Sequence, residues 1–522
     1  MISNKKNYFF TLFSGFGGVI FSIVLNLLTI PISLSYWKQD RYGIWVLLTS
    51  ILLYLGMTNL GLNTSASVLM AKNPRIRDKM KILKRSLIIL LFSVGTMLTA
   101  FLVLNLITKD WINIIGKIPT NLFRETFSAC VVLVIFYLLS LPFSLLSAVY
   151  TGFQKAYIEN VFSIVLNIVN FLVLLIVIFL KGNLITYAFL WGISLVLFNI
   201  TKYLFFYFSI YQKLPEGEVH ENDFSSRDTK YKTIFVTGIR FFLVGIASTI
   251  VWNTDIFVIS NFISLQAVTP YFITFKLFSV IFSVIFQISG SIMPLLAKEY
   301  GTNNWDWINK IYSSILVFIS VIGGATWIGG ILFFKDFITL WTGAANYAGL
   351  FTVIAFGGYA YLLSMVTLNS GIVNTFNYTS ISPFLAWGEA LIKITFSILM
   401  VKVWGIAGVA VGTFLGSLLI PTWILPIWIR KRSSGKLSYD FAFLKKQFIL
   451  VILPCLIISI LLQVFVVKLL ILRLTGIIIF LSYFLLTYFV MPLGYRTFFF
   501  RNLNQILKRI GIKSSVIDLV SD

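Results

Sequence analysis

Charged residues are scarce in this chain. Asp, Glu, Lys and Arg make up 11% of its 522 residues, whereas a water-soluble chain of this size needs about a quarter of its residues charged to cover its surface. The hydrophobic share is 58%. Apolar runs of about 20 residues recur along the whole sequence, and each is long enough to cross a hydrocarbon layer as a helix. The composition excludes a soluble domain and predicts an all-α integral membrane protein.

Cysteine and histidine are nearly absent, which excludes several kinds of site. Cys130 and Cys455 lie inside apolar runs and offer neither a disulfide framework nor a metal pair, and His220 is the only histidine. There is no Gly-Lys-Ser/Thr loop to cradle a phosphate, and the glycines at 15, 17 and 18 lack the strand and acidic residue of a nucleotide fingerprint. These glycines favour close helix packing instead. We expect no metal, no cofactor and no ATP hydrolysis.

Acidic residues are also few, and the net charge is +23. This excess does not indicate nucleic-acid binding, because most basic residues lie between apolar runs instead of clustering on soluble helices. The longest predicted external loop, Lys109–Glu125, contains only Asp110 and Glu125 as acids. A membrane glycosyltransferase would need acidic groups there to activate a hydroxyl. We therefore expect that the protein is not an enzyme and has no nucleic-acid partner.

The chain begins with Lys5 and Lys6 before an apolar run. This run is too long for a signal peptide and has no small-residue cleavage site, so it should remain as the first span. We expect fourteen spans in all. They lie roughly at 9–36, 43–70, 86–108, 127–150, 161–180, 184–210, 234–260, 267–297, 311–334, 348–373, 383–401, 405–428, 448–467 and 474–495.

Lysine and arginine predict the orientation. With the N-terminus inside, the cytoplasmic segments hold 27 basic residues and the external segments hold 10. The short loop 71–85 alone carries seven of them. Because basic residues accumulate on the cytoplasmic side, we expect both termini in the cytoplasm, as an even number of spans requires.

The polar stretch 212–232 divides the first six spans from the next six. We predict a first six-helix bundle over 1–211, a cytoplasmic linker over 212–232, a second bundle over 233–430, and two further spans with a basic tail over 431–522. Paired bundles of this kind form alternating-access transporters with a central substrate site. In the tail, 499–510 has amphipathic helical spacing with a basic face, which fits either the anionic membrane surface or an ordinary capping helix.

A few ionisable residues lie within the predicted spans, where an unpaired charge is costly and therefore points to function. They are Lys202, Arg240, Asp255, Lys276, Glu389 and Lys393. Arg240 and Asp255 are fifteen positions apart, which leaves them about 60° apart around the helix but about 22 Å apart along it. They therefore share a face without pairing. That face either lines a wet cavity or lets Arg240 extend to the membrane surface.

The other charges leave similar alternatives. Lys276 is about nine residues into its span, which is deep for a side chain that must reach the surface, so a cavity role is favoured. Glu389 and Lys393 stand at i and i+4 with the acid first, which suits either a cavity or a structural ion pair. Lys202 is expected to extend to the cytoplasmic surface.

Several short motifs resemble the Wzx-type O-antigen and capsule flippases. They are Tyr42-Gly43-Ile44-Trp45, Leu60-Gly61-Leu62-Asn63, Gly152-Phe153-Gln154-Lys155-Ala156-Tyr157, and Val268-Thr269-Pro270-Tyr271-Phe272 with Pro294. The stretch Gly405-Ile406-Ala407-Gly408-Val409-Ala410 resembles the wider superfamily that also holds multidrug (MATE) exporters and lipid II flippases. The resemblance covers the whole chain.

The resemblance implies two six-helix bundles in a V around a cavity lined mainly by spans 1, 2, 7 and 8. It implies an undecaprenyl-pyrophosphate-linked oligosaccharide as substrate, drive by an ion gradient or membrane potential, and a location in the bacterial inner membrane. A polysaccharide polymerase and a chain-length regulator are possible partners, beside the membrane lipids. No residue role carries over from the family alone.

A pyrophosphate needs fixed cations to replace its water. We therefore name Arg240, Lys276 and Lys393 as candidate substrate-binding cations, and Asp255 and Glu389 as candidates for ion coupling. The alternative is an ion-coupled multidrug antiporter of the same fold, which would favour an acidic cavity for cationic drugs. The predicted spans contain four basic and two acidic residues, and this excess of positive charge favours an anionic substrate. A membrane enzyme of glycan assembly is a third possibility, supported if charged residues of the external loops prove essential.

Overall fold

The structure is a computed structural model. It describes residues 2–73, 75–108, 111–209, 211–213, 229–437, 440–465, 469–492 and 495–496. The regular secondary structure in these ranges is helical throughout, as the composition predicts. His220, most of the predicted linker and the predicted tail helix 499–510 lie outside the described residues.

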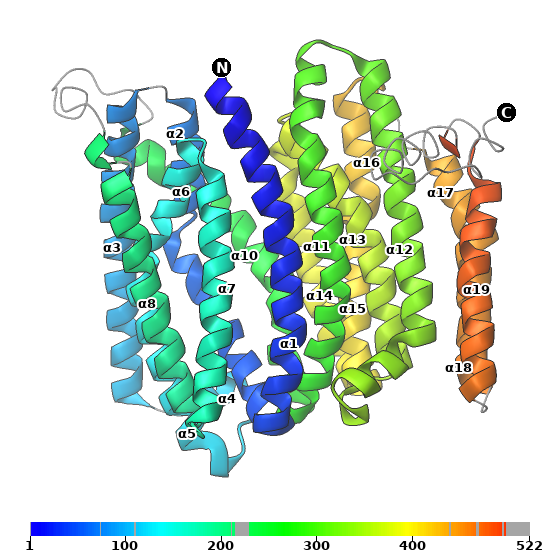
Figure 1. Ribbon diagram of the computed structural model, residues 1–522, viewed down its shortest axis with the longest axis horizontal. Helices are drawn as coiled ribbons and strands as arrows, with labels where there is room; N and C mark the ends of the chain where they lie inside the picture. Colours follow the sequence, from blue (N-terminus) through cyan, green and yellow to red (C-terminus); the bar gives the residue numbers. More distant parts are fainter. Residues whose placement is uncertain are drawn as a thin grey trace. The chain divides into compact units, whose positions relative to one another are not determined.

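Thirteen helices of the described chain are long and apolar enough to cross a membrane. The first of them is part of α1 (Ile2–Leu55), which is interrupted at Lys38, where φ is +57° and ψ is −174°. The first span therefore ends before Lys38, and the second begins after it and continues beyond the end of α1. Figure 1 shows α1 running away from the N-terminus, and the returning chain leads to α2. The prediction of about fourteen membrane helices is confirmed.

The chain divides into two compact units. The first comprises residues 1–273 with 397–409, and the second 274–396 with 410–522. The further helices that lie in the first unit are α2 (Leu62–Lys72), α3 (Ile76–Ile107), α4 (Trp111–Ile115), α5 (Thr120–Ser140), α6 (Leu145–Gly152), α7 (Ala156–Phe179), α8 (Leu184–Ser209) and α10 (Tyr231–Phe262). The predicted division at 212–232 falls mostly outside the described residues and stays a prediction.

The other helices belong to the second unit or cross between the two ranges. They are α11 (Leu265–Gly301), α12 (Trp305–Trp341), α13 (Leu350–Thr375), α14 (Ser382–Trp404), α15 (Ile406–Leu419), α16 (Pro421–Arg432), α17 (Phe441–Gln447), α18 (Leu453–Phe465) and α19 (Leu469–Val490). The predicted twelfth span is therefore two helices. Its break is at Ile420, directly before Pro421, which begins α16; proline is favoured in the first turn of a helix, where its missing N–H leaves no helical hydrogen bond unmade.

In the first unit, polar side chains fasten the first part of α1 to α7. The amide of Asn160 donates to the Ser14 hydroxyl at 3.0 Å, and the amide of Asn167 donates to the Ser22 hydroxyl at 2.7 Å. Such hydrogen bonds stabilise the association of membrane helices. Burial of apolar side chains alone does not, because lipid tails are as apolar as the helices. Asn167 thus has the structural role that is commonest for a polar residue in a span.

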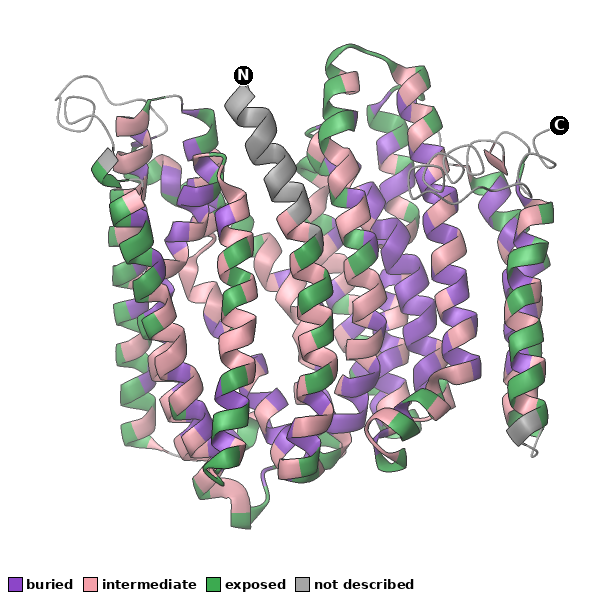
Figure 2. Cartoon of the chain, viewed as in Figure 1, coloured by how far each residue is buried: buried purple, intermediate pink, exposed green. Residues whose placement is uncertain are grey.

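In the second unit, α12 and α13 form the most buried part (Figure 2). Their contact depends on glycine: a Cβ on Gly357 would lie 2.3 Å from the ring of Trp327. A hydrogen bond from Tyr312 to Asn369, 2.7 Å long, adds a buried polar link. The outer helices α18 and α19 carry many exposed large apolar side chains, as expected of helices that face lipid.

Candidate functional site

The second predicted span is broken near its middle. After α1, residues Gly56–Asn59 form one turn of 3₁₀ helix, η1, and Leu60 and Gly61 then take left-handed conformations with φ of +51° and +70°. The helix resumes as α2. The break lies about 25 Å along the helix from Lys38 at 1.5 Å per residue. Non-helical backbone within a membrane span is tolerated only where it is buried in protein or lines a cavity.

Side chains satisfy the backbone groups that this break frees. The Asn59 side-chain oxygen accepts a hydrogen bond from the Gly61 amide at 2.8 Å. The Ser93 hydroxyl, on α3, donates to the carbonyl of Thr58 at 2.6 Å. These two hydrogen bonds replace backbone hydrogen bonds that a continuous helix would have made. The break is therefore a stable part of the span.

The backbone of the break contacts the backbone of α10. A Cβ on Gly61 would lie 2.3 Å from the Gly238 carbonyl oxygen, and a Cβ on Gly238 would lie 2.8 Å from the Leu60 carbonyl oxygen. Only glycine allows this approach. The segment Leu60–Asn63, which carries part of the resemblance to flippases, is therefore the place where spans 2 and 7 cross.

Arg240 lies on α10, two residues beyond Gly238, and its side chain is exposed. Arg240 thus lies on the helix that crosses the break, but about 200° around the helix axis from Gly238, and it makes no ion pair with a carboxylate in the part of the chain that is described.

Asp255 has a different environment on the same helix. Its side chain is 5% exposed and accepts a hydrogen bond from the Tyr271 hydroxyl on α11. The neighbouring Thr254 hydroxyl bonds the Tyr54 hydroxyl at 2.8 Å. Asp255 is therefore held by a tyrosine in the interior of the first unit, and the two charges of α10 have separate surroundings.

The remaining candidates lie in the second unit. Lys276, on α11, is half-buried and makes no ion pair within the described ranges. Lys393, on α14, is only 1% exposed, and a Cβ on Gly416 would lie 3.1 Å from its Cβ. Glu389 lies one turn earlier on the same helix and is half-buried. Both residues stay candidates for a cavity or for a structural pair.

Lys202 does not extend to the surface, so that expectation is wrong. Its side chain on α8 is 7% exposed, and its ammonium lies 2.6 and 2.7 Å from the two carboxylate oxygens of Glu159 on α7. The Glu159 carboxylate on the neighbouring helix attracts the Lys202 ammonium more strongly than water at the surface does, because a close ion pair is strengthened where water is excluded. Glu159 stands in the first turn of its helix, and that position is the one signal that could have suggested it.

The Lys202–Glu159 pair lines a partly open pocket of about 230 Å³ in the first unit, whose wall also contains apolar side chains such as Leu141 and Phe162. Tyr137, Asn199 and the serines at 140, 144, 147 and 163 also line it. No sequence pattern indicates this pocket, because its polar side chains come from separate helices and share no spacing. Its hydroxyl lining could hold water within the bundle.

The one described acid of the loop 109–125, which the sequence predicts to be external, is also engaged. The Glu125 carboxylate pairs with Arg41 at 3.1 Å and accepts a hydrogen bond from the Leu184 backbone amide at 2.9 Å. Asp110 lies outside the described residues. Glu125 therefore ties helices together, which weakens the enzyme alternative. Among the described residues, no group of three or more His, Cys, Asp or Glu is arranged to hold a metal ion.

Comparison with known proteins gives relatives of one kind. No family model matches the chain. A proposed O-antigen transporter of Salmonella typhi is 22% identical over 430 residues, which cover 78% of this chain and 93% of that protein. A protein of the same name from Salmonella typhimurium is 21% identical over 424 residues, which cover 79% of this chain and 94% of that protein.

Solved structures agree on the fold. An inward-facing multidrug transporter of the MATE family matches with a TM-score of 0.66 at 14% identity, covering 81% of this chain and 98% of that one. The lipid II flippase MurJ, in an inward closed conformation, matches with a TM-score of 0.64 at 14% identity, covering 94% and 99%. The chain has the MATE and MurJ fold. The resemblance to O-antigen transporters that the motifs predict is confirmed, and the chain is a multi-pass membrane protein.

Proposed function

We propose that this chain is a flippase for a lipid-linked oligosaccharide. It would move an undecaprenyl-pyrophosphate-linked repeat unit, of O-antigen or capsule, from the cytoplasmic to the periplasmic leaflet by alternating access. The protein would lie in the inner membrane with both termini in the cytoplasm, as the excess of basic residues in the predicted cytoplasmic segments supports.

The observation that carries this proposal is the likeness to O-antigen transporters over 93% of the length of such a protein. The fold adds support, because the lipid II flippase matches over 94% of this chain. Both comparisons include the helices on which the candidate cations lie. Loss of surface glycan on removal of the protein is therefore the first expected phenotype.

The pyrophosphate needs fixed positive charge along its path. An anion of this kind loses its water at a cost of many kcal/mol in hydrocarbon unless cations and hydrogen-bond donors replace that water. Arg240 and Lys276 suit this role because neither is engaged by a carboxylate in the described ranges. Lys393 is the weakest of the three candidates, since it is buried and has Glu389 beside it.

Ion coupling would use a carboxylate that can change its charge during transport. Asp255 is the better candidate of the two, because it is a buried carboxylate held by a hydrogen bond from the Tyr271 hydroxyl, whereas Glu389 has Lys393 one turn away on its own helix. Glu389 would otherwise serve the second unit with Lys393. A polysaccharide polymerase and a chain-length regulator are the partner proteins that would use the product.

The test is surface glycan display in a host whose own flippase gene has been deleted and replaced by this one. Arg240→Ala or Lys276→Ala should abolish display while the protein remains inserted at normal abundance. Lys232→Ala and Lys298→Ala are matched controls, because they remove exposed lysines from the same two helices. Normal display with both site variants would remove these residues from the substrate path.

A multidrug antiporter is the second candidate, favoured by the TM-score of 0.66 to a MATE transporter. Two phenotypes measured in the same host distinguish the two functions. An antiporter would raise resistance to cationic drugs without restoring glycan, whereas a flippase would restore glycan without changing resistance.

A further inference from the structure

A basic pocket lies in the second unit, where α16 ends and the chain turns toward α17. It has a volume of about 480 Å³ and is lined by Pro426, Ile427, Arg430, Lys431, Ser434, Gly435 and Phe441. That volume is within the range of small-ligand sites. None of the proposed substrate-path residues lines it.

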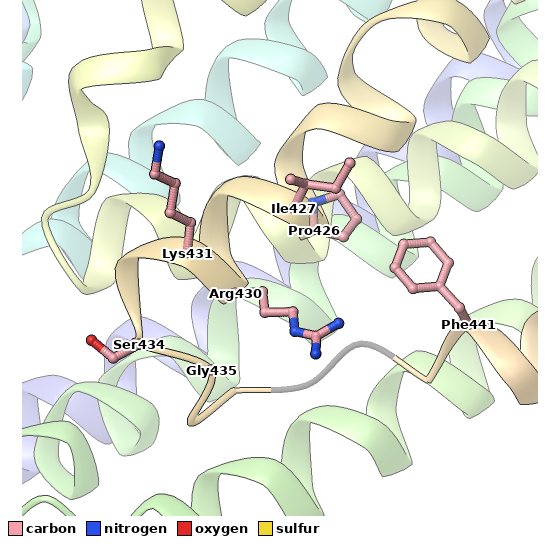
Figure 3. Close-up of a pocket in the computed structure, with 7 residues that line it drawn as sticks. All are labelled: Pro426, Ile427, Arg430, Lys431, Ser434, Gly435 and Phe441. Atoms are coloured by element: carbon pink, nitrogen blue, oxygen red, sulfur yellow. The ribbon is translucent and has the colours of Figure 1, made fainter.

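Local structure holds the pocket open. The α16 helix ends in a turn in which the Gly435 amide donates to the Arg430 carbonyl at 2.8 Å, with φ of +78° at Gly435. This helix end fixes the backbone of Arg430. Figure 3 shows the Arg430 guanidinium extending toward the Phe441 ring, with Pro426 and Ile427 beside them, while Lys431 leaves the same turn in another direction.

Charge in this region is almost entirely positive. Between 421 and 447 the chain has six basic residues and one acid, Asp440. Asp440 already caps α17 by accepting from the Phe443 amide at 3.0 Å and accepts a hydrogen bond from the Tyr495 hydroxyl at 3.1 Å. Asp440 forms no ion pair with Arg430 or Lys431 within the described residues.

Two of the cations are engaged by aromatic rings, but the two in the pocket are not. The Arg432 guanidinium lies 4.6 Å from the centre of the Trp428 ring, and the Lys436 ammonium lies 5.5 Å from that of Trp305. Arg430 and Lys431 are exposed and make no ion pair in the described chain. These two charges remain available to an anion from outside the protein.

The apolar side of the pocket continues along the helix toward the membrane. Ile427 is 60% exposed and Trp423 is 50% exposed. The Trp423 ring stacks with Phe441 at 6.5 Å between centroids. Aromatic residues of this kind gather where the polar headgroups of a bilayer meet its acyl chains. The pocket thus joins cations at one end to an apolar surface at the other.

We propose that this pocket binds an anionic phospholipid of the inner leaflet, with its phosphate at Arg430 and Lys431 and an acyl chain along Ile427 and Trp423. A basic pocket at the cytoplasmic ends of membrane helices is the kind of surface that selects anionic headgroups. Neither a soluble anion nor a protein partner would use the exposed apolar stretch that faces the bilayer.

The test measures lipid binding directly by native mass spectrometry of the full chain in detergent. Dioleoyl phosphatidylglycerol is the probe, and dioleoyl phosphatidylcholine and inorganic phosphate are the comparison arms. We expect phosphatidylglycerol to bind at least tenfold more tightly than phosphatidylcholine, and inorganic phosphate not to displace it at tenfold excess. Equal binding of the two lipids, or displacement by phosphate, would overturn the proposal.

The variant Arg430→Gln/Lys431→Gln should lose affinity for phosphatidylglycerol by about twenty-fivefold, since each cation near the surface contributes about fivefold. The matched control Lys445→Gln/Lys446→Gln removes the same charge from exposed lysines outside the pocket. It should change affinity by less than threefold. An equal loss in both variants would mean diffuse attraction and no site.

Folding does not obscure this result, because both pocket cations are exposed and lack partners in the described chain. Arg430→Lys keeps the charge and should retain most of the binding. Tight binding by the double pocket variant would refute the site. The measurement involves no transport, so a failure here is distinct from a failure of the flippase proposal.

Discussion

Gly61 and Gly238 bring the backbones of two membrane helices together inside the first unit: a Cβ on Gly61 would lie 2.3 Å from the Gly238 carbonyl oxygen. Arg240 follows two residues later on α10. The crossing therefore positions the helix that carries the main candidate cation, and a side chain at either glycine would push that helix away.

Gly61→Ala should destabilise the protein by about 2 kcal/mol or more, because alanine is strained at positive φ and has no space there. Gly238→Ala should cost about 1–3 kcal/mol through overpacking alone. Thermal unfolding in detergent, followed by size-exclusion chromatography, measures both. Gly245→Ala on the same helix is the control, since nothing lies within 4 Å of its Cβ position. Unfolding temperatures equal to that of Gly245→Ala would refute the close crossing.

The Lys202–Glu159 pair should behave as a buried ion pair. Lys202→Met leaves the acid without its partner and should cost up to about 3 kcal/mol, and Glu159→Gln made together with it should recover part of that loss. Arg41→Met, at the more exposed pair with Glu125, should cost about 1 kcal/mol or less. The same thermal assay compares them. No recovery in the double variant would argue against a direct coupling of the two charges.

Lys276 should tolerate a change of shape better than a change of sign. Lys276→Arg keeps a cation for the phosphate and should retain most glycan display, whereas Lys276→Glu should abolish it by repulsion. Quantitative blotting of surface glycan, normalised to protein abundance, measures the difference. Equal display by the two variants would argue against an electrostatic role.

Asp255→Asn tests the proposed coupling group. Asparagine still accepts the bond from Tyr271 but cannot become charged, so the fold should survive while gradient-driven transport fails. Glycan display and abundance are measured together, with Tyr271→Phe as the companion variant. Normal display by Asp255→Asn would eliminate Asp255 as the coupling carboxylate. A fall in abundance alone would show that its role is structural.

Sequence patterns predict the helices of this protein well because a run of apolar residues must become a helix in lipid, where backbone groups have no other partner. They do not predict the break at Gly61, since 3₁₀ and left-handed residues keep the same apolar composition. They also miss the link from Lys202 to Glu159, 43 positions apart. Such a contact depends on which helices become neighbours, and that information has no local period.

The candidate site residues also have some properties that the local sequence predicts and others that depend on contacts with distant helices. Depth within a span marked Arg240 and Lys276 as unusual cations, because charge is costly in hydrocarbon wherever it occurs. Whether each cation has a partner depends on other helices. Lys393 has the same local signal as Lys276, yet it is buried in the second unit with Glu389 beside it.

We propose that Arg240 contacts the phosphate of the moving lipid, and a reconstituted flipping assay measures that step itself. Proteoliposomes would carry a fluorescent prenyl-pyrophosphate-linked oligosaccharide, and its arrival in the opposite leaflet would be timed. We predict that Arg240→Ala slows translocation at least tenfold, as loss of a charge-assisted contact should, while Lys232→Ala stays within twofold of the native rate. A native rate for Arg240→Ala would show that Arg240 does not assist the phosphate.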